Sequence, residues 1–591
     1  MVTLFQGRRC YFCILIWRIS VLKLNTMKQL IECVPNYSEG QDMAIIEQIA
    51  EVIRQSEGVK LLNVDPGKAT NRTVITFVGE PVYVVEAAFK SIKKAGELID
   101  MRHHHGEHPR FGATDVCPLV PIANITMEET TGWARKLAKR IGEELDIPVY
   151  CYEFAASSEE RRSLANCRSG EYEGLRNKLE LPEWKPDFGP SVWNEQISKT
   201  GATAIGARNF LVAYNINLNT TSVRRANAIA FDVREAGRVL RDGDPLTGKI
   251  LKDENGEPVR IQGSLQKVRA IGWFIEEYDI AQISMNLTDI KVTPVHIAFD
   301  EVCLKAAERG IRVTGSELVG LIPLEAMLEA GRYFLRKQQR STGVSDAELI
   351  KIAVKSLGLD ELAPFEPRER IIEYMLEETD GNKLELMTVR GFVEETASES
   401  AAPGGGSVAA LAGAMGASLG TMVANLSSHK RGWDNRWEEF SEWAEKGKYY
   451  YNALLRCVDE DTEAFNKVMN AFGLPKSTIA EKETRKEAIQ SGTLNAMLVP
   501  LKVMQLSFES MEVMLAMAQS GNPNSVSDAG VGALCARAAV RGAWLNVKIN
   551  ASVLDNKERS EEILAEAAEI AAKAQMLEEK ILEIVYGKIE G

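Results

Sequence analysis

The sequence predicts a multidomain protein in which two α/β subdomains, of the α+β, ferredoxin-like kind, precede an all-α helical domain. Its 591 residues exceed what one hydrophobic core can organise. Short β-rich runs alternate with amphipathic helices from Met27 to about Met375, and helical periodicity alone continues from about Asp380. We therefore expect a leader at 1–26, subdomains at 27–209 and 210–376, a linker at 377–383 and a helical domain at 384–591.

The first subdomain is predicted from a β-α-β-β-α-β order of segments, in which two strands are joined by a turn at Pro66 and Gly67. A segment rich in proline and tryptophan, 181–196, ends this block. The expected strands are 29–38, 59–65, 72–79, 114–122 and 147–154, and the expected helices are 43–55, 82–99 and 128–145.

The second subdomain is expected to begin near Phe210. Its predicted elements are a strand at 209–218, a helix from Thr221, a charged hairpin insertion at 241–260, and further strands within 268–287 and at 291–296.

Composition and charge narrow the class of protein. The net charge of -13 disfavours binding to a polyanion, so no nucleic-acid partner is expected. The nine cysteines are scattered and odd in number, which favours free thiols in a reducing, cytoplasmic compartment.

Two apolar segments resemble a signal peptide and a membrane-spanning helix, respectively. Residues 1–26 have the outline of a signal peptide, but Arg18 interrupts the apolar run, and we expect translation to begin at Met27. Residues 407–426 carry no charge but consist mostly of Ala, Gly and Ser. This composition predicts a buried helix, with Gly416 and Gly420 at a close helix contact, and no membrane partner.

Four of the six histidines lie between His103 and His108, within the segment HHHGEHPRFGATD. Gly106, Pro109 and Gly112 make this segment a loop between a helix and a strand, a common position for active-site residues. The cluster could bind a metal, act in acid–base catalysis or form a solvated turn, and the residues alone leave all three open.

Other polar residues follow the neighbouring strands. Asn36 and Glu39 come after the first strand, and Asp65, Asn71 and Arg72 lie at the turn between the next two. Because loops at one edge of a sheet converge, these side chains could join the histidine loop. Alternatively, each Asn and Asp stabilises its own turn.

Asp461 occupies an apolar position of a predicted helix. Steps of four and three along the chain keep residues on one face, and Asp461 falls within such a series. Burial raises the pKa of a carboxyl, so Asp461 could donate a proton near neutral pH. The alternative is a structural carboxylate that caps a helix or pairs with an Arg or Lys. The apolar members of the series are Leu454, Val458, Phe465, Val468 and Phe472.

A glycine-rich turn precedes the uncharged helix. Gly404, Gly405 and Gly406 follow Pro403, and the helix is expected to start near Ser407. Accessible amides at a helix N-terminus suit an anionic or planar ligand, although a helix-entry turn alone would also explain the glycines.

Several longer segments resemble known enzymes. ECVPNYSEG, TNRTVITFVG, GEHPRFGATDVCP and GATAIGARNFLVAYNINL resemble the glutamate formimidoyltransferase family. SAAPGGGSVAA with VDEDTEAF resembles the helical formimidoyltetrahydrofolate cyclodeaminase that is fused to it in bifunctional enzymes. The resemblance covers Met27 to the C-terminus.

The resemblance implies a folate enzyme of histidine degradation. The transferase would move the formimino group of N-formimino-L-glutamate to tetrahydrofolate, releasing L-glutamate. The cyclodeaminase would then form methenyltetrahydrofolate and ammonia. The resemblance also implies a polyglutamylated folate cosubstrate, no required metal, and a homo-oligomer in which dimers assemble into a ring.

Residue by residue, the resemblance places the catalytic histidine at His108 and the catalytic aspartate at Asp461. One imidazole could accept the proton of the attacking folate nitrogen and return it to the leaving glutamate nitrogen. The folate-binding stretch corresponds to 189–201, which includes Gly189, Pro190, Ser191 and Gly201.

Supporting residues are expected around both catalytic groups. Asp65 or Glu107 would orient His108, and Arg72 and Arg110 would bind the substrate carboxylates, with Asn36 beside them. Polar residues of the later helices either line the second site or serve helix packing: Asp528, Asn546 and Asn550. Two other functions stay open, a metal-dependent amidohydrolase that uses the His103–His108 cluster and a folate-binding scaffold with one active domain.

Overall fold

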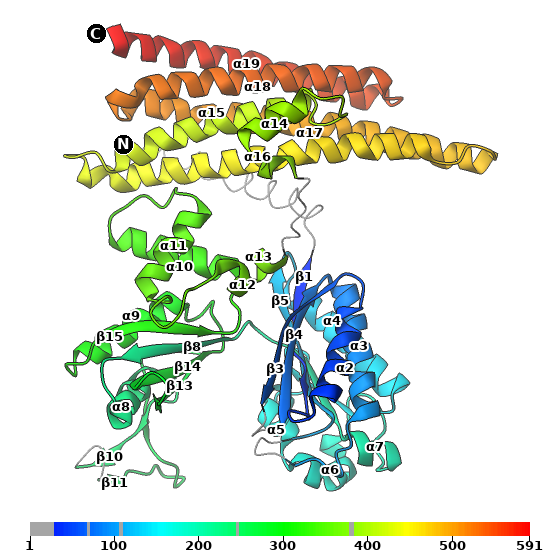
Figure 1. The fold of residues 1–591 in the computed structure, drawn as a ribbon, viewed down its shortest axis with the longest axis vertical. Coiled ribbons are helices and arrows are strands. Elements are labelled where there is room, and N and C mark those ends of the chain that lie inside the picture. Colours follow the sequence, from blue (N-terminus) through cyan, green and yellow to red (C-terminus); the bar gives the residue numbers. More distant parts are fainter. Residues whose placement is uncertain (1–28, 68–70, 106–109, 244–247, 377–382, 591) are drawn as a thin grey trace. The chain divides into compact units, whose positions relative to one another are not determined.

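The computed structural model describes residues 29–67, 71–105, 110–243, 248–376 and 383–590 (Figure 1). They form two compact units. The first unit comprises the described residues up to Pro323 together with Arg368–Leu376, and the second comprises Leu324–Pro367 and the described residues from Lys383 onward.

The first unit is built on a seven-stranded sheet. Its strand order is β1-β4-β2-β5-β7-β6, with β3 paired to β4 and β1 also paired to β5. β5, β7 and β6 run parallel to one another, and the other pairings are antiparallel. The strands are β1 (Leu30–Cys33), β2 (Asn36–Tyr37), β3 (Val59–Gly67), β4 (Arg72–Gly79), β5 (Thr114–Ala123), β6 (Val149–Glu153) and β7 (Thr203–Ala207).

Three long helices cover one face of this sheet, and short helices lie against part of the other. α2 (Met43–Arg54), α3 (Pro81–Leu98) and α4 (Met127–Glu144) lie on the first face (Figure 1). They enclose a core that includes Ile31, Phe77 and Leu119. The short helices α5 (Leu164–Arg168), α6 (Glu171–Glu180) and α7 (Glu195–Thr200) form a smaller core around Phe111 and Tyr150.

A second, antiparallel sheet has the order β13-β14-β8-β15. Along the chain its elements follow as β8, α8, β13, β14, α9, β15. Two short strand pairs, β9 with β12 and β10 with β11, form the inserted hairpin. The bounds are β8 (Val212–Leu218), α8 (Val223–Val233), β9 (Arg238–Val239), β10 (Arg241–Asp242), β11 (Lys249–Ile250), β12 (Arg260–Ile261), β13 (Val268–Ile275), β14 (Ile280–Leu287), α9 (Val295–Ala307) and β15 (Val313–Val319). The short helix α13 (Ile372–Leu376) also belongs to this unit, as does α12 (Pro367–Arg370) from Arg368 onward.

Two segments of the first unit differ from the sequence prediction. Residues 291–296 were expected to be a strand, but α9 begins at Val295 with Pro294 as its N-cap. Proline suits a helix start, because its missing N–H would have no intrahelical acceptor there. The sequence prediction missed β7. Its five small or apolar residues are buried between two strands, so they do not show the alternation of polar and apolar residues that indicates a strand.

The second unit is helical, as the sequence predicts. Its helices are α10 (Leu324–Lys337), α11 (Asp346–Leu357), α14 (Val389–Thr396), α15 (Gly405–Ser428), α16 (Trp437–Gly473), α17 (Ile479–Ser520), α18 (Val526–Val553) and α19 (Lys557–Glu590). The connection after α10 packs on this bundle, since the amide N–H of Thr342 donates to Ser441 Oγ at 3.0 Å and Asn425 Nδ2 donates to Gly343 O at 3.0 Å. Residues 324–367 therefore pack with the helical bundle.

α15 lies in the middle of the bundle. A β-carbon at Gly416 would lie 2.7 Å from Gly532 O, and one at Gly420 would lie 3.2 Å from Val513 Cγ1. These glycines therefore permit the close contact with α18 and α17 that their spacing predicts. Among the described helices α15 is the one long and apolar enough to cross a membrane, and 61% of its most apolar stretch is buried inside the structure.

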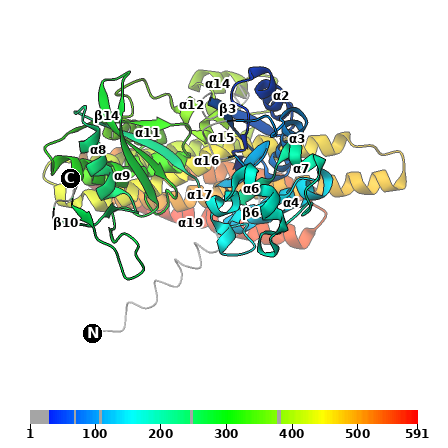
Figure 2. The ribbon, with the colours of Figure 1, turned by 90° about the horizontal axis from the view of Figure 1, so that it is seen from below.

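The distal ends of α16 and α17 extend beyond the other helices (Figure 2). Phe465 and Phe472, predicted to face a core, are 40% and 48% exposed. Leu454 and Val458, earlier in α16, are buried. The predicted apolar stripe is therefore correct for the first half of α16 and wrong for the projecting half, where few helices are available to cover it.

Candidate active sites

The first candidate site lies on the partly covered face of the seven-stranded sheet. Asp65, Val74, Asn36 and Val116 are partners across β3, β4, β2 and β5, so they form one row on one face. Arg72 lies two residues before Val74 and shares that face. Asp65 is exposed at the edge strand, whereas Asn36 is buried.

Two arginines and one aspartate meet beside this row. The Arg72 guanidinium donates to Asn36 Oδ1, and the Arg168 guanidinium donates to Asp115 Oδ2. Asp115 has a side chain only 2% exposed, and its charge also acts on Arg72. Burial lowers the pKa of Arg72, and the neighbouring Arg168 charge adds to this effect. The cluster holds more positive than negative charge, which suits a carboxylate ligand.

The histidine loop is anchored next to this cluster. His104 Nε2 donates to Asn71 O at 2.8 Å, and Asn71 Nδ2 donates to His105 O at 2.8 Å. His104 is buried, and burial lowers the pKa of its imidazole. His103 and His105 are exposed, so the three adjacent histidines do not face one point. Glu107 and His108 lie outside the described residues.

Arg110, on the other flank of the loop, is already engaged. Its guanidinium donates to Glu173 and to the carbonyl of His104. The side chain is 12% exposed and lies beside Tyr172. A substrate carboxylate would have to displace Glu173 to bind Arg110 fully.

The predicted folate-binding stretch is divided by the structure. Gly201 forms an isolated bridge with Gly112 and follows α7, which brings it next to the histidine loop. Gly189 instead lies against Ile147 and Gly142, and Pro190 and Ser191 follow it. A β-carbon at Gly189 would lie 2.3 Å from Ile147 O, so close packing explains this glycine.

Sequence reasoning did not assign Arg168 to the site and did not single out the buried Glu32 of β1, which pairs with Val78 and Val120. Arg168 lies in α5, a helix of five residues, which is too short to show a sequence pattern that would indicate the role of Arg168. Glu32 is 4% exposed in β1, and burial raises its pKa to about 7, while the charge of Arg208 acts in the opposite direction. A glutamate inside the apolar strand LIEC was the available signal.

The second candidate site lies at the N-terminus of α15. Ser407 Oγ donates to Val458 O at 2.9 Å and lies 3.3 Å from Asp461 Oδ2. Burial raises the pKa of Asp461, and hydrogen bonds from the hydroxyl and amide of Ser407 act in the opposite direction. Asp461 is half-buried, and it could therefore hold a proton that Ser407 helps to position.

The two acids next to Asp461 have other partners. Asp459 accepts the amide N–H groups of Leu384 and Glu385, and Glu460 forms an ion pair with Lys502 at 2.7 Å. Among the described side chains no Lys, Arg or His forms an ion pair with Asp461. Of the two structural alternatives for Asp461, the described residues therefore show the helix-capping contact and not an ion pair with a Lys or Arg side chain.

The glycine turn and one residue of α18 complete this site. Gly404 is the N-cap of α15, and Gly406 lies directly against the Asp461 carboxylate. A β-carbon at Gly405 would lie 3.5 Å from Asn546 Nδ2, so Asn546 faces the same helix start. Asn550 serves helix packing instead, because its Nδ2 donates to Ala496 O in α17 at 2.9 Å.

Asp528 is not brought to this site. It lies 18 positions before Asn546 in α18, which corresponds to about 27 Å along the helix axis. The predicted grouping of Asp528 with Asp461 is therefore not found within the described chain, because α18 is one uninterrupted helix that spans the bundle.

The α/β unit contains a basic polar cluster, and the helical unit contains a half-buried acid at a glycine-rich helix start. Together these features define a class of enzyme with one site in each unit. The chain matches family models described as "Formiminotransferase domain, N-terminal subdomain" at 30–208, "Formiminotransferase domain" at 213–377 and "Formiminotransferase-cyclodeaminase" at 388–569. It is 44% identical to formimidoyltransferase-cyclodeaminase of Gallus gallus over 90% of this chain and 95% of that protein. The chain belongs to the formimidoyltransferase-cyclodeaminase family.

Relatives of each half alone also exist. Glutamate formimidoyltransferase of Thermoplasma acidophilum is 42% identical over 52% of this chain and 92% of its own length. Methenyltetrahydrofolate cyclohydrolase of Methylorubrum extorquens is 39% identical over 34% of this chain and 97% of its own length. The two halves therefore correspond to proteins that occur separately.

Proposed function

We propose that the chain transfers the formimino group of N-formimino-L-glutamate to tetrahydrofolate and then cyclodeaminates the product to methenyltetrahydrofolate and ammonia. The observation that carries the second activity is the half-buried Asp461 against Gly406 and Ser407. In that step a neighbouring ring nitrogen of the folate attacks the formimino carbon. The departing nitrogen must be protonated, and Asp461 supplies this proton.

For the first activity we propose His108 as the group that moves protons between the attacking and leaving nitrogens. The supporting observation is that its chain neighbours His104 and His105 are held against Asn71, next to Arg72. Arg72 and Arg168 would bind a carboxylate of the glutamyl substrate. Gly201, beside Gly112, would place the folate near the same loop.

The experiment supplies tetrahydrofolate and formiminoglutamate and follows methenyltetrahydrofolate absorbance and ammonia release. His108→Ala should abolish transfer and spare cyclodeamination of supplied formiminotetrahydrofolate, and Asp461→Asn should do the reverse. Loss of both activities in either well-folded variant would contradict two separate sites. Activity that survives exhaustive chelation is expected, since we propose that neither step requires a metal. Stoichiometric metal with loss of activity on chelation would instead favour the amidohydrolase.

We further propose that the folate is polyglutamylated and that the chain forms a homo-oligomer of dimers arranged in a ring. The oligomer is supported by an apolar stripe on α15, where Val408, Met415 and Met422 recur every seven residues and are 40%, 53% and 38% exposed. Met415→Glu should lower the molar mass in light scattering, while Met576→Glu, at an exposed methionine of α19, should have less effect. Equal mass for both variants would place the contact elsewhere.

A cytoplasmic location is proposed from the cysteines. Seven described cysteines are free, and Cys33 Sγ and Cys117 Sγ remain 3.4 Å apart without a bond. Cell fractionation tests this location directly.

A further inference from the structure

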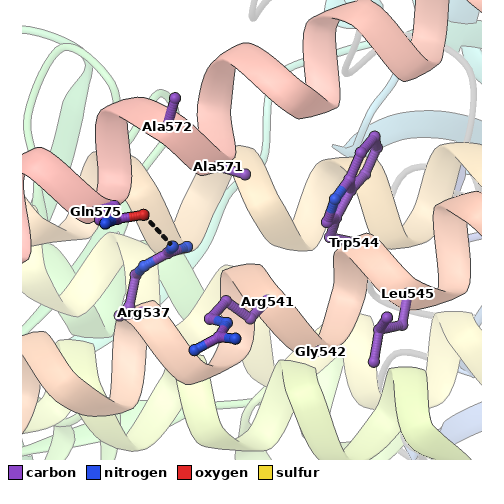
Figure 3. Close-up of a pocket in the computed structure, with 8 residues that line it drawn as sticks. All are labelled: Arg537, Arg541, Gly542, Trp544, Leu545, Ala571, Ala572 and Gln575. Carbon is purple, nitrogen blue, oxygen red and sulfur yellow. Dashed lines mark hydrogen bonds between the residues drawn. The ribbon is translucent and has the colours of Figure 1, made fainter.

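A cavity of about 360 Å³ lies between α18 and α19 (Figure 3). Its lining combines two guanidiniums with an aromatic ring and small apolar side chains: Arg537, Arg541, Gly542, Trp544, Leu545, Ala571, Ala572 and Gln575. Cavities of this volume are at the lower end of the range that binds small organic molecules.

Arg537 of the cavity points away from the Asp461 site. Asn546 faces Gly405 at that site, and Arg537 precedes Asn546 by nine residues. Nine residues correspond to two and a half helical turns, so the two side chains leave α18 in opposite directions. A ligand held by Arg537 would therefore lie away from Asp461, although Gly542 of the lining lies one turn before Asn546.

Arg537 has an unmet hydrogen-bond donor in this cavity. Its side chain is 12% exposed, Nε lies 3.5 Å from Glu578 Oε2, and Nη2 donates to Gln575 Oε1 at 3.4 Å. Nη1 is buried and has no hydrogen-bond acceptor among the described residues. A buried guanidinium with such long contacts is costly, and a bound anion would supply the missing acceptor.

Arg541 adds a second cation one helical turn further along α18. It is exposed and forms no ion pair with any described carboxylate. Figure 3 shows its side chain on the same side of α18 as Arg537. Two guanidiniums at this spacing can bind the two oxygens of one carboxylate.

The lining supplies two cations, Arg537 and Arg541, for an anionic ligand. The carboxylates of Glu578 and Glu579, which lie outside the lining, also act on Arg537 and offset much of this positive charge. A ligand with a single negative charge therefore fits better than a multiply charged anion.

The other lining residues favour a ligand that carries an apolar or aromatic group. Trp544 offers a ring, and Leu545, Ala571 and Ala572 offer aliphatic surface without polar groups. Such a surface favours a flat hydrocarbon group over a hydrated ion, because apolar area leaves water when the group binds.

We propose that this cavity is a second ligand site, which binds an aromatic monocarboxylate with its carboxylate on Arg537 and Arg541 and its ring against Trp544. This inference does not depend on the proposed function of the chain. It assigns a binding role to Arg537 and Arg541 beyond helix packing.

The test titrates hippurate, an aromatic monocarboxylate, into the full-length protein by isothermal calorimetry. Arg541→Gln should weaken binding about tenfold, because glutamine replaces a charge-assisted hydrogen bond to the carboxylate with a weaker neutral one. Ala572→Phe should abolish binding by filling the cavity without changing any charge. Arg559→Gln, an exposed arginine of α19 paired with Glu562, is the matched control and should bind as the unmodified protein does.

Two results would overturn the proposal. Hippurate binding that neither Arg541→Gln nor Ala572→Phe changes would place the ligand elsewhere. Inorganic phosphate bound as tightly as hippurate would show that the cavity recognises charge alone. Arg541 and Ala572 are exposed, so both variants should fold, and circular dichroism together with retained cyclodeaminase activity checks this.

Discussion

A β-carbon placed on Gly406 would lie 2.1 Å from Asp461 Oδ1. Real β-carbons do not approach an oxygen this closely, so the absence of a side chain at Gly406 is what allows the carboxylate to lie against the first turn of α15. Ser407, the next residue, directs its hydroxyl toward the same carboxylate. The glycine turn therefore has a steric function at Asp461 in addition to any role in binding a ligand.

Gly406→Ala is expected to reduce cyclodeaminase activity about a hundredfold, because a displacement of about 1 Å of a catalytic group has an effect of this size. The displaced group is the Asp461 carboxylate. Transfer of the formimino group should be unchanged. The measurement is the rate of methenyltetrahydrofolate formation from supplied formiminotetrahydrofolate.

Gly473→Ala is the matched control for this substitution. Gly473 lies at the end of α16, and a β-carbon there would meet nothing within 4 Å. If both alanine variants had equal cyclodeaminase rates, contact with Asp461 would not be the reason for glycine at 406.

Asp461→Asn should raise the melting temperature of the helical unit by a few degrees at pH 8. Burial raises the pKa of Asp461, so the stability contributed by its protonated form is present at low pH and is lost as pH rises through the folded-state pKa. The asparagine amide cannot ionise, so the variant does not lose this stability as the pH rises. The difference between variant and unmodified protein should therefore shrink toward pH 4, and thermal melts at several pH values check this. A variant less stable than the parent at pH 8 would indicate that Asp461 is mainly a structural cap.

Asp461 also illustrates how far the sequence could predict the site. A carboxylate within a series of apolar residues indicated burial, and the structure places it half-buried beside Ser407. The same series predicted burial of Phe465, which is exposed, because helical periodicity does not indicate where neighbouring helices end.

In the basic cluster of the first unit, the sequence predicted two of the residues and missed a third. Asn36 and Arg72 were expected near the histidine loop from their positions after strands, and they do lie together. Arg168 could not be predicted, since it is distant in sequence from Asp115 and its partner choice depends on how α5 packs. The linear pattern of the sequence carries no information on such long-range pairs.

Arg168→Gln should destabilise the first unit by about 3 kcal/mol, because it leaves the buried Asp115 carboxylate without its guanidinium. Transfer activity should fall with a raised KM for formiminoglutamate, while cyclodeamination should be unchanged. Denaturant unfolding and steady-state kinetics measure the two effects. Arg162→Gln is the control, since Arg162 and its partner Glu159 are exposed and such pairs contribute little. An unchanged KM in Arg168→Gln would remove Arg168 from the substrate site.

Glu32→Gln should change the pH dependence of stability in the first sheet. Burial raises the pKa of Glu32 from 4.5 to about 7, so its protonated form stabilises the folded state below pH 4.5. This contribution, about 3 kcal/mol, is lost as pH rises to about 7. Glutamine cannot ionise and should make β1 more resistant to hydrogen exchange at pH 8 than the unmodified chain, with no difference near pH 4.

The control for Glu32 is Glu47→Gln, an exposed glutamate of α2 that pairs with Arg54. Its exchange profile in β1 should follow that of the unmodified protein at every pH. Equal protection of β1 in Glu32→Gln and the parent at pH 8 would mean that Glu32 is ionised there without cost, and that the Arg208 charge outweighs its burial.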